Sequence, residues 1–311
     1  MKILITGGTG LVGRHVIPAL LARGDEVVCV SRDASRAQHV LPAQVEVIEA
    51  DPAQTGPWLA AVAAADAVIN LAGESVASGW LWTGGKKRRL RRSRLRVTAH
   101  LAEALRTSDR PCVFLSGSAS GYYGEGGEQA LGEDHEPGHD FLSVLACEWE
   151  RAALAAESDR CRVVCLRLGV VLSRDGGALA RLVPIFARGQ GGPLGNGRQY
   201  FPWIHVGDVV RAILFALDTP QVRGPINVSV PDPPRQREFA SALGRAIGRS
   251  ARFATPAFVL HLALGQKAGM LLASQRLVPS ALRSHGFHFE HANLDLALAN
   301  LLGDASPVTG R

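Results

Sequence analysis

A glycine-rich segment directly follows the first apolar run of this 311-residue chain and constrains its fold more than any other feature. Lys2–Thr6 has the continuous apolar composition of a buried strand. The next residues, Gly7-Gly8-Thr9-Gly10-Leu11-Val12-Gly13, have the spacing G-x-x-G-x-x-G, and a helical pattern begins at Leu11. A strand, a glycine turn and a helix in this order predict the first unit of a βαβ fold.

Each glycine of this turn has a physical role in binding a diphosphate. Gly7 permits the tight turn, Gly10 lets the backbone approach the ligand, and Gly13 lets the helix pack close to the strand. Free N–H groups and the helix dipole then stabilise the anion. The turn predicts a dinucleotide site that also includes Thr9, Leu11 and Val12; a tight turn without a ligand is the alternative.

The end of the second predicted strand indicates which dinucleotide is bound. Ser31 and Arg32 stand where an acidic residue would accept hydrogen bonds from the ribose 2′-hydroxyl of NAD. A hydroxyl and a guanidinium suit a 2′-phosphate instead, and such a charge-assisted contact contributes about 1.5–3 kcal/mol. We predict NADP(H) as the cofactor, with a solvated surface arginine as the alternative.

The first 170 residues alternate apolar runs of strand length with longer helical patterns. This alternation predicts an α/β fold with a doubly wound parallel sheet. The predicted strands are Lys2–Thr6, Glu26–Ser31, Val45–Glu49, Ala67–Leu71, Cys112–Ser116, Arg162–Leu168 and Pro225–Val230. The predicted helices are Leu11–Arg23, Trp58–Ala65, Lys86–Arg106, Leu142–Ala156 and Val206–Leu217.

The pattern changes after about residue 170, where glycine and proline become frequent. We predict two domains. Residues 1–170 with 206–230 form the NADP-binding domain, and residues 171–205 with 231–303 form a small, mainly helical C-terminal substrate domain over the carboxyl end of the sheet. Residues 304–311 lack periodicity and are predicted to be a flexible tail.

The five cysteines are odd in number and show no C-x-x-C spacing, which favours buried thiols over a disulfide framework or a zinc site. We expect no metal. No charged segment followed by an apolar one opens the chain, and no run of eighteen apolar residues occurs. These features predict a cytoplasmic protein.

Several motifs spread over nearly the whole chain occur in an order that resembles one family. They are Asn70–Glu74, Ser93-Arg94 with Thr98, Gly121–Gly124, Trp149-Glu150, Arg167–Leu172, Gly195–Gln199, Pro202–His205 with Asp208, and Ser274–Arg276. The chain resembles the extended short-chain dehydrogenases/reductases, and more closely their atypical "epimerase family" branch, some of whose members carry an older label of cell-division inhibitor. The resemblance implies that Leu71, Ala72, Glu74, Arg94 and Val170 belong to the cofactor site.

The chain departs from this superfamily at the Tyr-x-x-x-Lys pair, which performs proton transfer from one helix face. The corresponding helix here contains neither tyrosine nor lysine. With Glu150 as the reference, the pair falls on Leu142 and Ala146; a shift of one residue gives Ser143 and Cys147. Neither register supplies an equivalent acid–base pair.

Two residues after the fifth predicted strand are candidates for catalysis. Ser118 stands where the superfamily has a substrate-orienting serine, and Tyr123 matches a tyrosine that contacts substrate. Packing of the aromatic loop is the alternative for Tyr123. Arg94 replaces an asparagine of the proton relay and predicts an anion contact, with a structural ion pair to Glu74 as the alternative.

Lys86–Arg96 contains eight basic residues in eleven. No aromatic residues interleave and no nucleic-acid fold motif accompanies the run, so we expect a solvated helix face with Arg94 turned inward. The partners expected are an unknown small-molecule substrate, no nucleic acid and no membrane, for a monomer or homodimer.

Two functions remain open from the sequence. The first is an NADP-dependent oxidoreductase or isomerase that acts on a small polar substrate with a non-standard active site. The second is an NADP(H)-binding sensor or interaction protein without catalysis, which the missing tyrosine and lysine favour. We lean towards the enzyme because Ser118, Tyr123 and Arg94 are placed to line a pocket.

Overall fold

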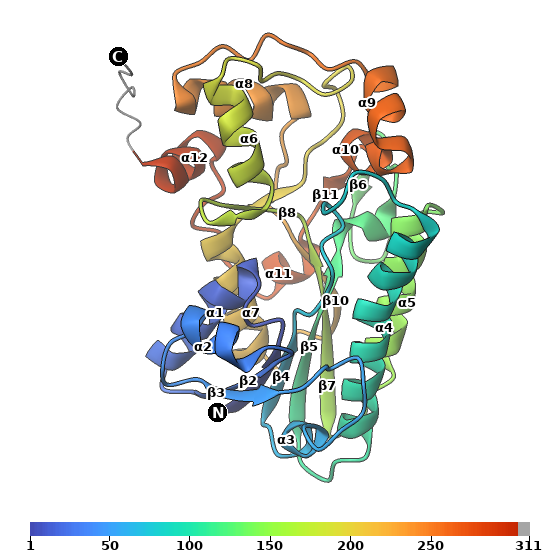
Figure 1. Ribbon diagram of the computed structural model, residues 1–311, viewed down its shortest axis with the longest axis vertical. Helices are drawn as coiled ribbons and strands as arrows, with labels where there is room; N and C mark the ends of the chain where they lie inside the picture. Colours follow the sequence, from blue (N-terminus) through green and yellow to red (C-terminus); the bar gives the residue numbers. More distant parts are fainter. Residues whose placement is uncertain (304–311) are drawn as a thin grey trace.

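A computed structural model describes residues 1–303 of the chain, so the predicted tail lies outside the described residues. Its centre is a seven-stranded parallel sheet with the order β10-β7-β5-β4-β1-β2-β3 (Figure 1). The strands are β1 (Lys2–Thr6), β2 (Glu26–Ser31), β3 (Glu46–Glu49), β4 (Ala67–Asn70), β5 (Cys112–Ala119), β7 (Cys161–Leu168) and β10 (Gly224–Val228). The strand order reverses between β1 and β4, where open α/β sheets bind ligands beyond the carboxyl ends of their strands.

Helices cover both faces of this sheet. One face packs against α1 (Leu11–Ala22), α2 (Ala34–Val40) and α7 (Val206–Asp218), through an apolar core that includes Ile17 and Ile213. The other face packs against α3 (Leu59–Ala63), α4 (Gly84–Arg106) and α5 (Phe141–Leu154), through a core that includes Leu101 and Phe114. The predicted doubly wound α/β fold is therefore confirmed.

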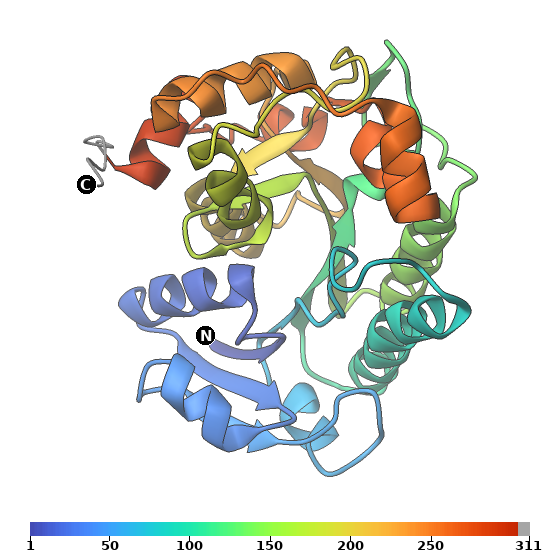
Figure 2. The same ribbon diagram turned by 45° about the horizontal axis from the view of Figure 1, so that its top comes forward.

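A mainly helical region lies over the carboxyl end of the sheet, as Figure 2 shows from above. It contains α6 (Gly177–Ala187), α8 (Gln236–Ile247), α9 (Ala257–Leu264), α10 (Gly269–Leu272) and α12 (Leu294–Leu302), whereas α11 (Ser280–Ser284) packs against β10 and adds Leu282 to the core of the first sheet face. Helices α6, α8 and α12 share an apolar core that surrounds Trp203 and Phe239. Two short two-stranded sheets join this region to the rest, one made of β8 (Val170–Ser173) and β9 (Trp203–His205), the other of β6 (Ala130–Leu131) and β11 (Arg276–Leu277).

The predicted strands and helices of the sheet layers all occur, with shifts of one to three residues at their ends. The largest shift matters for the site, because β5 continues through Ala119 and places Ser118 inside the strand. Helices α2 and α6 and the two small sheets were not predicted. Within residues 1–303, no helix is both long enough and apolar enough to cross a bilayer.

Candidate functional site at the carboxyl edge of the sheet

The glycine turn brings β1, α1 and the end of β4 into close contact. Gly7 has φ +76°, and a Cβ on it would lie 2.5 Å from the backbone carbon of Leu71. A Cβ on Gly13 would lie 2.5 Å from the carbonyl oxygen of Gly8, and one on Gly10 would lie 3.0 Å from that of Gly7. A side chain at Gly7 would push the turn away from the segment after β4, and a side chain at Gly13 would push α1 away from the turn, so both positions require glycine.

The N-terminus of α1 has no cap from the protein. Its N-cap residue is Gly10, no side chain accepts a hydrogen bond there, and the first turn contains no acidic residue. The N–H groups of Leu11, Val12 and Gly13 have no acceptor among residues 1–303. Three free donors and the positive end of a 12-residue helix fit a diphosphate.

The end of β2 presents one free cation beside this turn. Arg32 is exposed and has no hydrogen-bond or ion-pair partner within the described chain. Ser31 Oγ donates to the Asp33 carbonyl at 3.0 Å and accepts the Asp33 N–H at 3.3 Å, so its hydroxyl stabilises the start of α2. Arg32 is thus available to an added phosphate, while Ser31 already has local partners.

A buried polar network fixes the backbone after β4. Thr6 Oγ1 donates to Asn70 Oδ1 at 2.8 Å, and the N–H of Ala72 donates to the same oxygen at 3.3 Å. Asn70 Nδ2 and Trp149 Nε1 each donate to Thr98 Oγ1 at 2.8 Å. The network holds Leu71-Ala72 against the glycine turn, so both predicted site residues lie at the switch point.

The side chains of Glu74 and Arg94 do not form the ion pair that was the alternative for Arg94. The Glu74 carboxylate accepts from Lys86 Nζ at 2.7 Å and from Arg89 Nε at 3.3 Å. Burial opposes its charge, but the hydrogen bonds from Lys86 and Arg89 outweigh burial and keep the pKa of Glu74 below its ordinary value. Arg94 Nη1 donates instead to the Glu74 backbone carbonyl at 3.0 Å.

Arg94 is turned inward, as predicted. Its guanidinium lies 5.1 Å from the Trp149 ring centroid, and a Cβ on Gly73 would lie 3.1 Å from its central carbon. Burial lowers the pKa of Arg94 to about 10, although the charge of Glu74 partly opposes that fall. A guanidinium without a carboxylate partner, packed against the backbone after β4, has donors available for an anionic ligand.

The candidates Ser118 and Tyr123 lie in a buried network rather than on an open loop. Ser118 Oγ donates to Glu150 Oε1 at 2.6 Å, and Arg167 forms an ion pair with the same carboxylate at 2.8 and 2.9 Å. Tyr123 Oη donates to Asn227 Oδ1 at 2.7 Å and accepts from Arg167 Nη1 at 2.8 Å. Ser118 and Tyr123 are each only 3% exposed.

Charge states in this network are fixed by burial and by the ion pair. Burial raises the pKa of Tyr123 to about 12, with the Arg167 charge opposing that rise. Burial also disfavours the charged form of Arg167, but the hydrogen bond and charge of Glu150 outweigh burial and raise the pKa of that guanidinium. The Arg167 guanidinium also stacks on the Tyr122 ring, with 3.5 Å between the guanidinium carbon and the centroid.

Leu142 and Ser143, one from each register of the missing pair, both contact Gly121 just after β5. A Cβ on Gly121 would lie 3.2 Å from the Leu142 Cβ, and Ala146 is buried on the same helix face as Glu150. Ser143 Oγ, in the other register, donates to the Gly121 carbonyl at 2.9 Å. Leu142 and Ala146 carry no titratable group, so the first register offers no acid–base pair.

Elements from the C-terminal part cover the start of α1. A Cβ on Gly177 would lie 3.0 Å from Leu11 Cδ2, and His15 Nε2 lies 3.1 Å from Asp175 Oδ2. Val170 begins β8, two residues after the end of β7, and donates its N–H to the Pro202 carbonyl at 2.7 Å. The segment from β7 to α6 thus extends from the sheet edge to the helix N-terminus.

Both ring nitrogens of His205 have hydrogen-bond partners within the protein. Its Nδ1 accepts the Gly207 N–H at 3.0 Å as the cap of α7, and its Nε2 lies 3.1 Å from Asn300 Oδ1. Burial, with the nearby His291, lowers the pKa of His205 to about 4. The neutral ring therefore connects α7 to α12 through its two hydrogen bonds.

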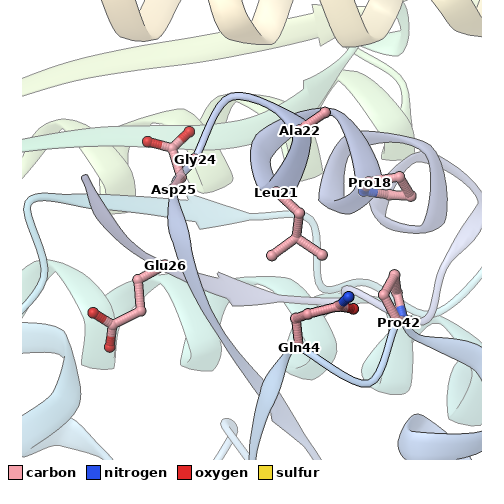
Figure 3. Close-up of a pocket in the computed structure, with 8 residues that line it drawn as sticks. All are labelled: Pro18, Leu21, Ala22, Gly24, Asp25, Glu26, Pro42 and Gln44. Carbon is pink, nitrogen blue, oxygen red and sulfur yellow. The ribbon is translucent and has the colours of Figure 1, made fainter.

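A surface pocket lies at the opposite end of α1 from the glycine turn (Figure 3). Leu21 and Gly24 near the end of α1, Glu26 at the start of β2, and Pro42 and Gln44 before β3 line it. It faces the amino edge of the sheet and is remote from the glycine turn. Among residues 1–303, no three histidine, cysteine or acidic side chains are grouped as metal ligands.

Asn70, Thr98 and Trp149 have a structural role that goes beyond the family motifs to which they belong. The structure shows that they connect β1, β4, α4 and α5. An asparagine at the end of an apolar strand was a usable signal, because a buried amide must find several partners. Lys86 gave no such signal, since it stands among seven other basic residues.

Comparisons with known proteins agree with this geometry. Residues 3–229 match the model of the NAD dependent epimerase/dehydratase family, and residues 255–301 match a domain of unknown function, DUF1731. "Epimerase family protein Mb2239" of Mycobacterium bovis is 37% identical over 297 residues, covering 95% of this chain and 96% of that protein. The "Epimerase family protein SDR39U1 homolog, chloroplastic" of Arabidopsis thaliana is 35% identical over 305 residues, covering 97% and 87%. The crystal structure of human SDR39U1 (isoform 2) with NADPH superposes with a TM-score of 0.85 at 32% identity, covering 97% of this chain and 99% of that one.

Proposed function

Since this chain belongs to the NAD dependent epimerase/dehydratase family, we propose that it binds NADP(H) and acts as an oxidoreductase or isomerase on a small polar substrate. The active site of this enzyme lacks Tyr-x-x-x-Lys. The family membership agrees with the resemblance found in the sequence. The substrate class and the reaction are our proposal.

The uncapped N-terminus of α1 carries the cofactor proposal. The free N–H groups of Leu11, Val12 and Gly13 would hold the diphosphate, together with the backbone of Thr9 and Gly10. Arg32 would contact the adenosine 2′-phosphate, with Ser31 beside it. The NADPH in the crystal structure of human SDR39U1 supports the choice of NADP(H) over NAD(H).

The residues after β4 and on α4 would hold the other half of the cofactor. Leu71-Ala72 lies against the glycine turn, and Arg94 presents donors beside Glu74 and Gly73. Val170 lies where the chain leaves β7. The cofactor supplies hydride transfer when it is bound. The chain would orient the substrate by hydrogen bonds and exclude water, without a tyrosine–lysine pair to move the proton.

A second candidate is an NADP(H)-binding sensor or interaction protein without turnover. Ser118 and Tyr123 favour it, because both hydroxyls already have buried partners and the ring of Tyr123 is 3% exposed. Leu142 and Ala146 favour it as well, because the helix face that carries the acid–base pair in the superfamily is apolar here.

Binding and turnover measurements separate these proposals. We expect NADPH to bind more tightly than NADH, measured by fluorescence titration of protein stripped of ligand. Carbonyl compounds and sugar nucleotides are then screened for loss of the reduced-nicotinamide absorbance. Sustained turnover that Arg94→Ala abolishes, with Arg249→Ala as an exposed control, supports the enzyme.

Three other results would favour the second candidate or contradict the proposed cofactor binding. NADPH binding without turnover on broad panels favours the sensor. Tighter binding of NADH contradicts the role given to Arg32, and uptake of neither dinucleotide contradicts both candidates. Thermal unfolding of Arg94→Ala shows whether a loss of turnover reflects a loss of folding.

A further inference from the structure

Large apolar side chains are exposed where the loop after β4 meets α9. Trp80, Phe258 and Leu262 are 72%, 71% and 86% exposed, and Leu81 and Val259 beside them are 47% and 38% exposed. We call these five residues the apolar surface. Soluble monomers rarely expose a contiguous apolar patch of this kind without a binding role.

Specific contacts hold the two parts of the apolar surface together. Lys267 Nζ donates to the carbonyls of Ala77 and Gly79 at 2.8 Å, which fixes the loop against the turn after α9. A Cβ on Gly265 would lie 3.5 Å from Leu81 Cδ2. Helix α9 has the sequence AFVLHLAL, without a charged lysine, arginine or acidic residue, and buries only Leu260. The apolar surface is therefore a built feature of the fold and not a frayed end.

The segments that form and flank this surface have an unusual charge distribution. Residues 75–102 and 239–289 together contain fourteen lysine and arginine residues and no aspartate or glutamate. The whole chain has a net charge of only +6, so the rest of the molecule is acidic. Positive charge is thus concentrated in the two segments that carry the exposed apolar side chains.

Part of this positive charge is free of acidic partners within residues 1–303 and lies on α4, whose start adjoins the turn after α9. Lys87 Nζ donates to Gln266 Oε1 at 2.5 Å, so the start of α4 adjoins the turn after α9, as Figures 1 and 2 show. Arg88, Arg92 and Arg96 follow on successive turns of α4, all exposed and without an acidic partner among residues 1–303. Spacing of four residues places them on one helix face. We call these three residues the arginine face.

We propose that the apolar surface and the arginine face dock this protein on the surface of an anionic phospholipid bilayer. Tryptophan, phenylalanine and leucine partition into the boundary between headgroups and acyl chains, and arginines beside them attract anionic headgroups. A second copy of this chain is a poorer occupant, because a symmetric dimer would bring like-charged basic segments together. Residues 75–102 and 239–289 contribute no acidic side chain that an anionic membrane would repel.

Docking on a membrane surface differs from spanning a membrane. The expectation of no membrane partner rested on the lack of a spanning segment, and none occurs in the described residues. Docking on a surface needs only exposed apolar side chains and nearby cations. The proposal also gives the basic run a role other than a solvated helix face.

Vesicle co-sedimentation of the full chain tests the proposal. We expect binding to vesicles of phosphatidylcholine mixed with phosphatidylglycerol, weak binding to phosphatidylcholine alone, and a decrease of binding in high salt. Leu262→Glu should weaken binding to the mixed vesicles at least about tenfold, because it removes a partitioning side chain and adds repulsion. Leu296→Glu is the matched control, since Leu296 is 70% exposed on α12, away from α9.

Charge reversal tests the arginine face. Arg88→Glu with Arg92→Glu should weaken binding at least about thirtyfold, because each basic residue near an anionic surface contributes about fivefold and the two added carboxylates are repelled as well. Arg106→Glu with Arg160→Glu changes the net charge equally at the amino edge of the sheet and should leave binding nearly unchanged. Circular dichroism and thermal unfolding verify that each variant folds.

Three results would overturn the proposal. The first is equal binding to neutral and anionic vesicles, or to neither. The second is loss of binding in the arginine variant with no change in Leu262→Glu, which would indicate non-specific attraction of a basic protein. The third is a concentration-dependent dimer in sedimentation velocity that Leu262→Glu dissociates, which would assign the surface to a second copy. NADPH affinity is measured in parallel, so failure of docking is distinguishable from failure of the proposed function.

Discussion

Arg167 and Glu150 form a two-point ion pair in the interior, with N–O distances of 2.8 and 2.9 Å and side chains only 3% and 6% exposed. Removing one partner of a buried pair leaves the other charge uncompensated. We expect Glu150→Ala to lower the free energy of unfolding by about 3–5 kcal/mol, measured by urea unfolding.

Glu103→Ala is the control for this prediction. Glu103 pairs with Arg106 on the surface of α4, where both side chains are about three-fifths exposed. Loss of such a pair changes stability by about 1 kcal/mol or less. A similar small effect for Glu150→Ala would mean that solvent reaches the network of Ser118 and Tyr123.

Gly13→Ala tests the geometry of the glycine turn. The new Cβ would lie 2.5 Å from the Gly8 carbonyl oxygen, so α1 must move away from β1. We expect the dissociation constant for NADPH to rise at least about tenfold and stability to fall by about 1–3 kcal/mol. Gly269→Ala is the control, because Gly269 has a helical φ of −53° and open space around its Cβ position.

Arg32→Ala should change cofactor selectivity. A charge-assisted contact to the 2′-phosphate contributes about 1.5–3 kcal/mol, so the dissociation constant for NADPH should rise ten- to a hundredfold. The constant for NADH should stay the same, because NADH lacks that phosphate. Isothermal titration calorimetry measures both, with Arg249→Ala as an exposed control; a parallel loss of NADH binding would contradict the assignment.

His205 should make stability depend on pH. Its pKa is about 4 in the folded protein, against 6.5 for the ordinary side chain, so the unfolded chain binds the extra proton first as the pH falls. The contribution of His205 is complete above about pH 6.5 and decreases towards pH 4, by about 2–3 kcal/mol in all.

Unfolding of His205→Asn along the same pH series isolates this effect. Asparagine cannot titrate, so the variant should lose less stability between pH 6.5 and pH 4 than the natural protein does. His288→Asn, at an exposed position, should follow the natural protein. Equal slopes for His205→Asn and the natural protein would show that His205 remains protonatable in the folded state.

The sequence predicted the central sheet because its strands are buried on both sides and are therefore continuous apolar runs, as in Ala67–Asn70. It did not predict β6 and β11, two strands of two residues each, because so short a ladder has no periodicity. It also did not predict α2, whose seven polar-rich residues bury only Ala37.

Those features of the candidate site that depend on local sequence were predicted, and those that depend on tertiary contacts were not. The glycine turn is local, and the structure places Gly7 and Gly13 where only glycine fits. The partner of Glu74 depends on tertiary structure, because Lys86 turns inward to 4% exposure from within a run of eight basic residues. Similarly, the length of β5 determines that Ser118 faces Glu150, and no local pattern marks where that strand ends.

Asp208 joins the two regions that match separate family models. It is fully buried on α7, and its carboxylate accepts the N–H groups of Glu290 and His291 at 3.0 and 2.9 Å. Truncating the chain before residue 255 would remove both N–H donors and leave the buried carboxylate of Asp208 with Arg211 as its ion-pair partner. The C-terminal region therefore helps to stabilise the sheet domain through this single buried carboxylate.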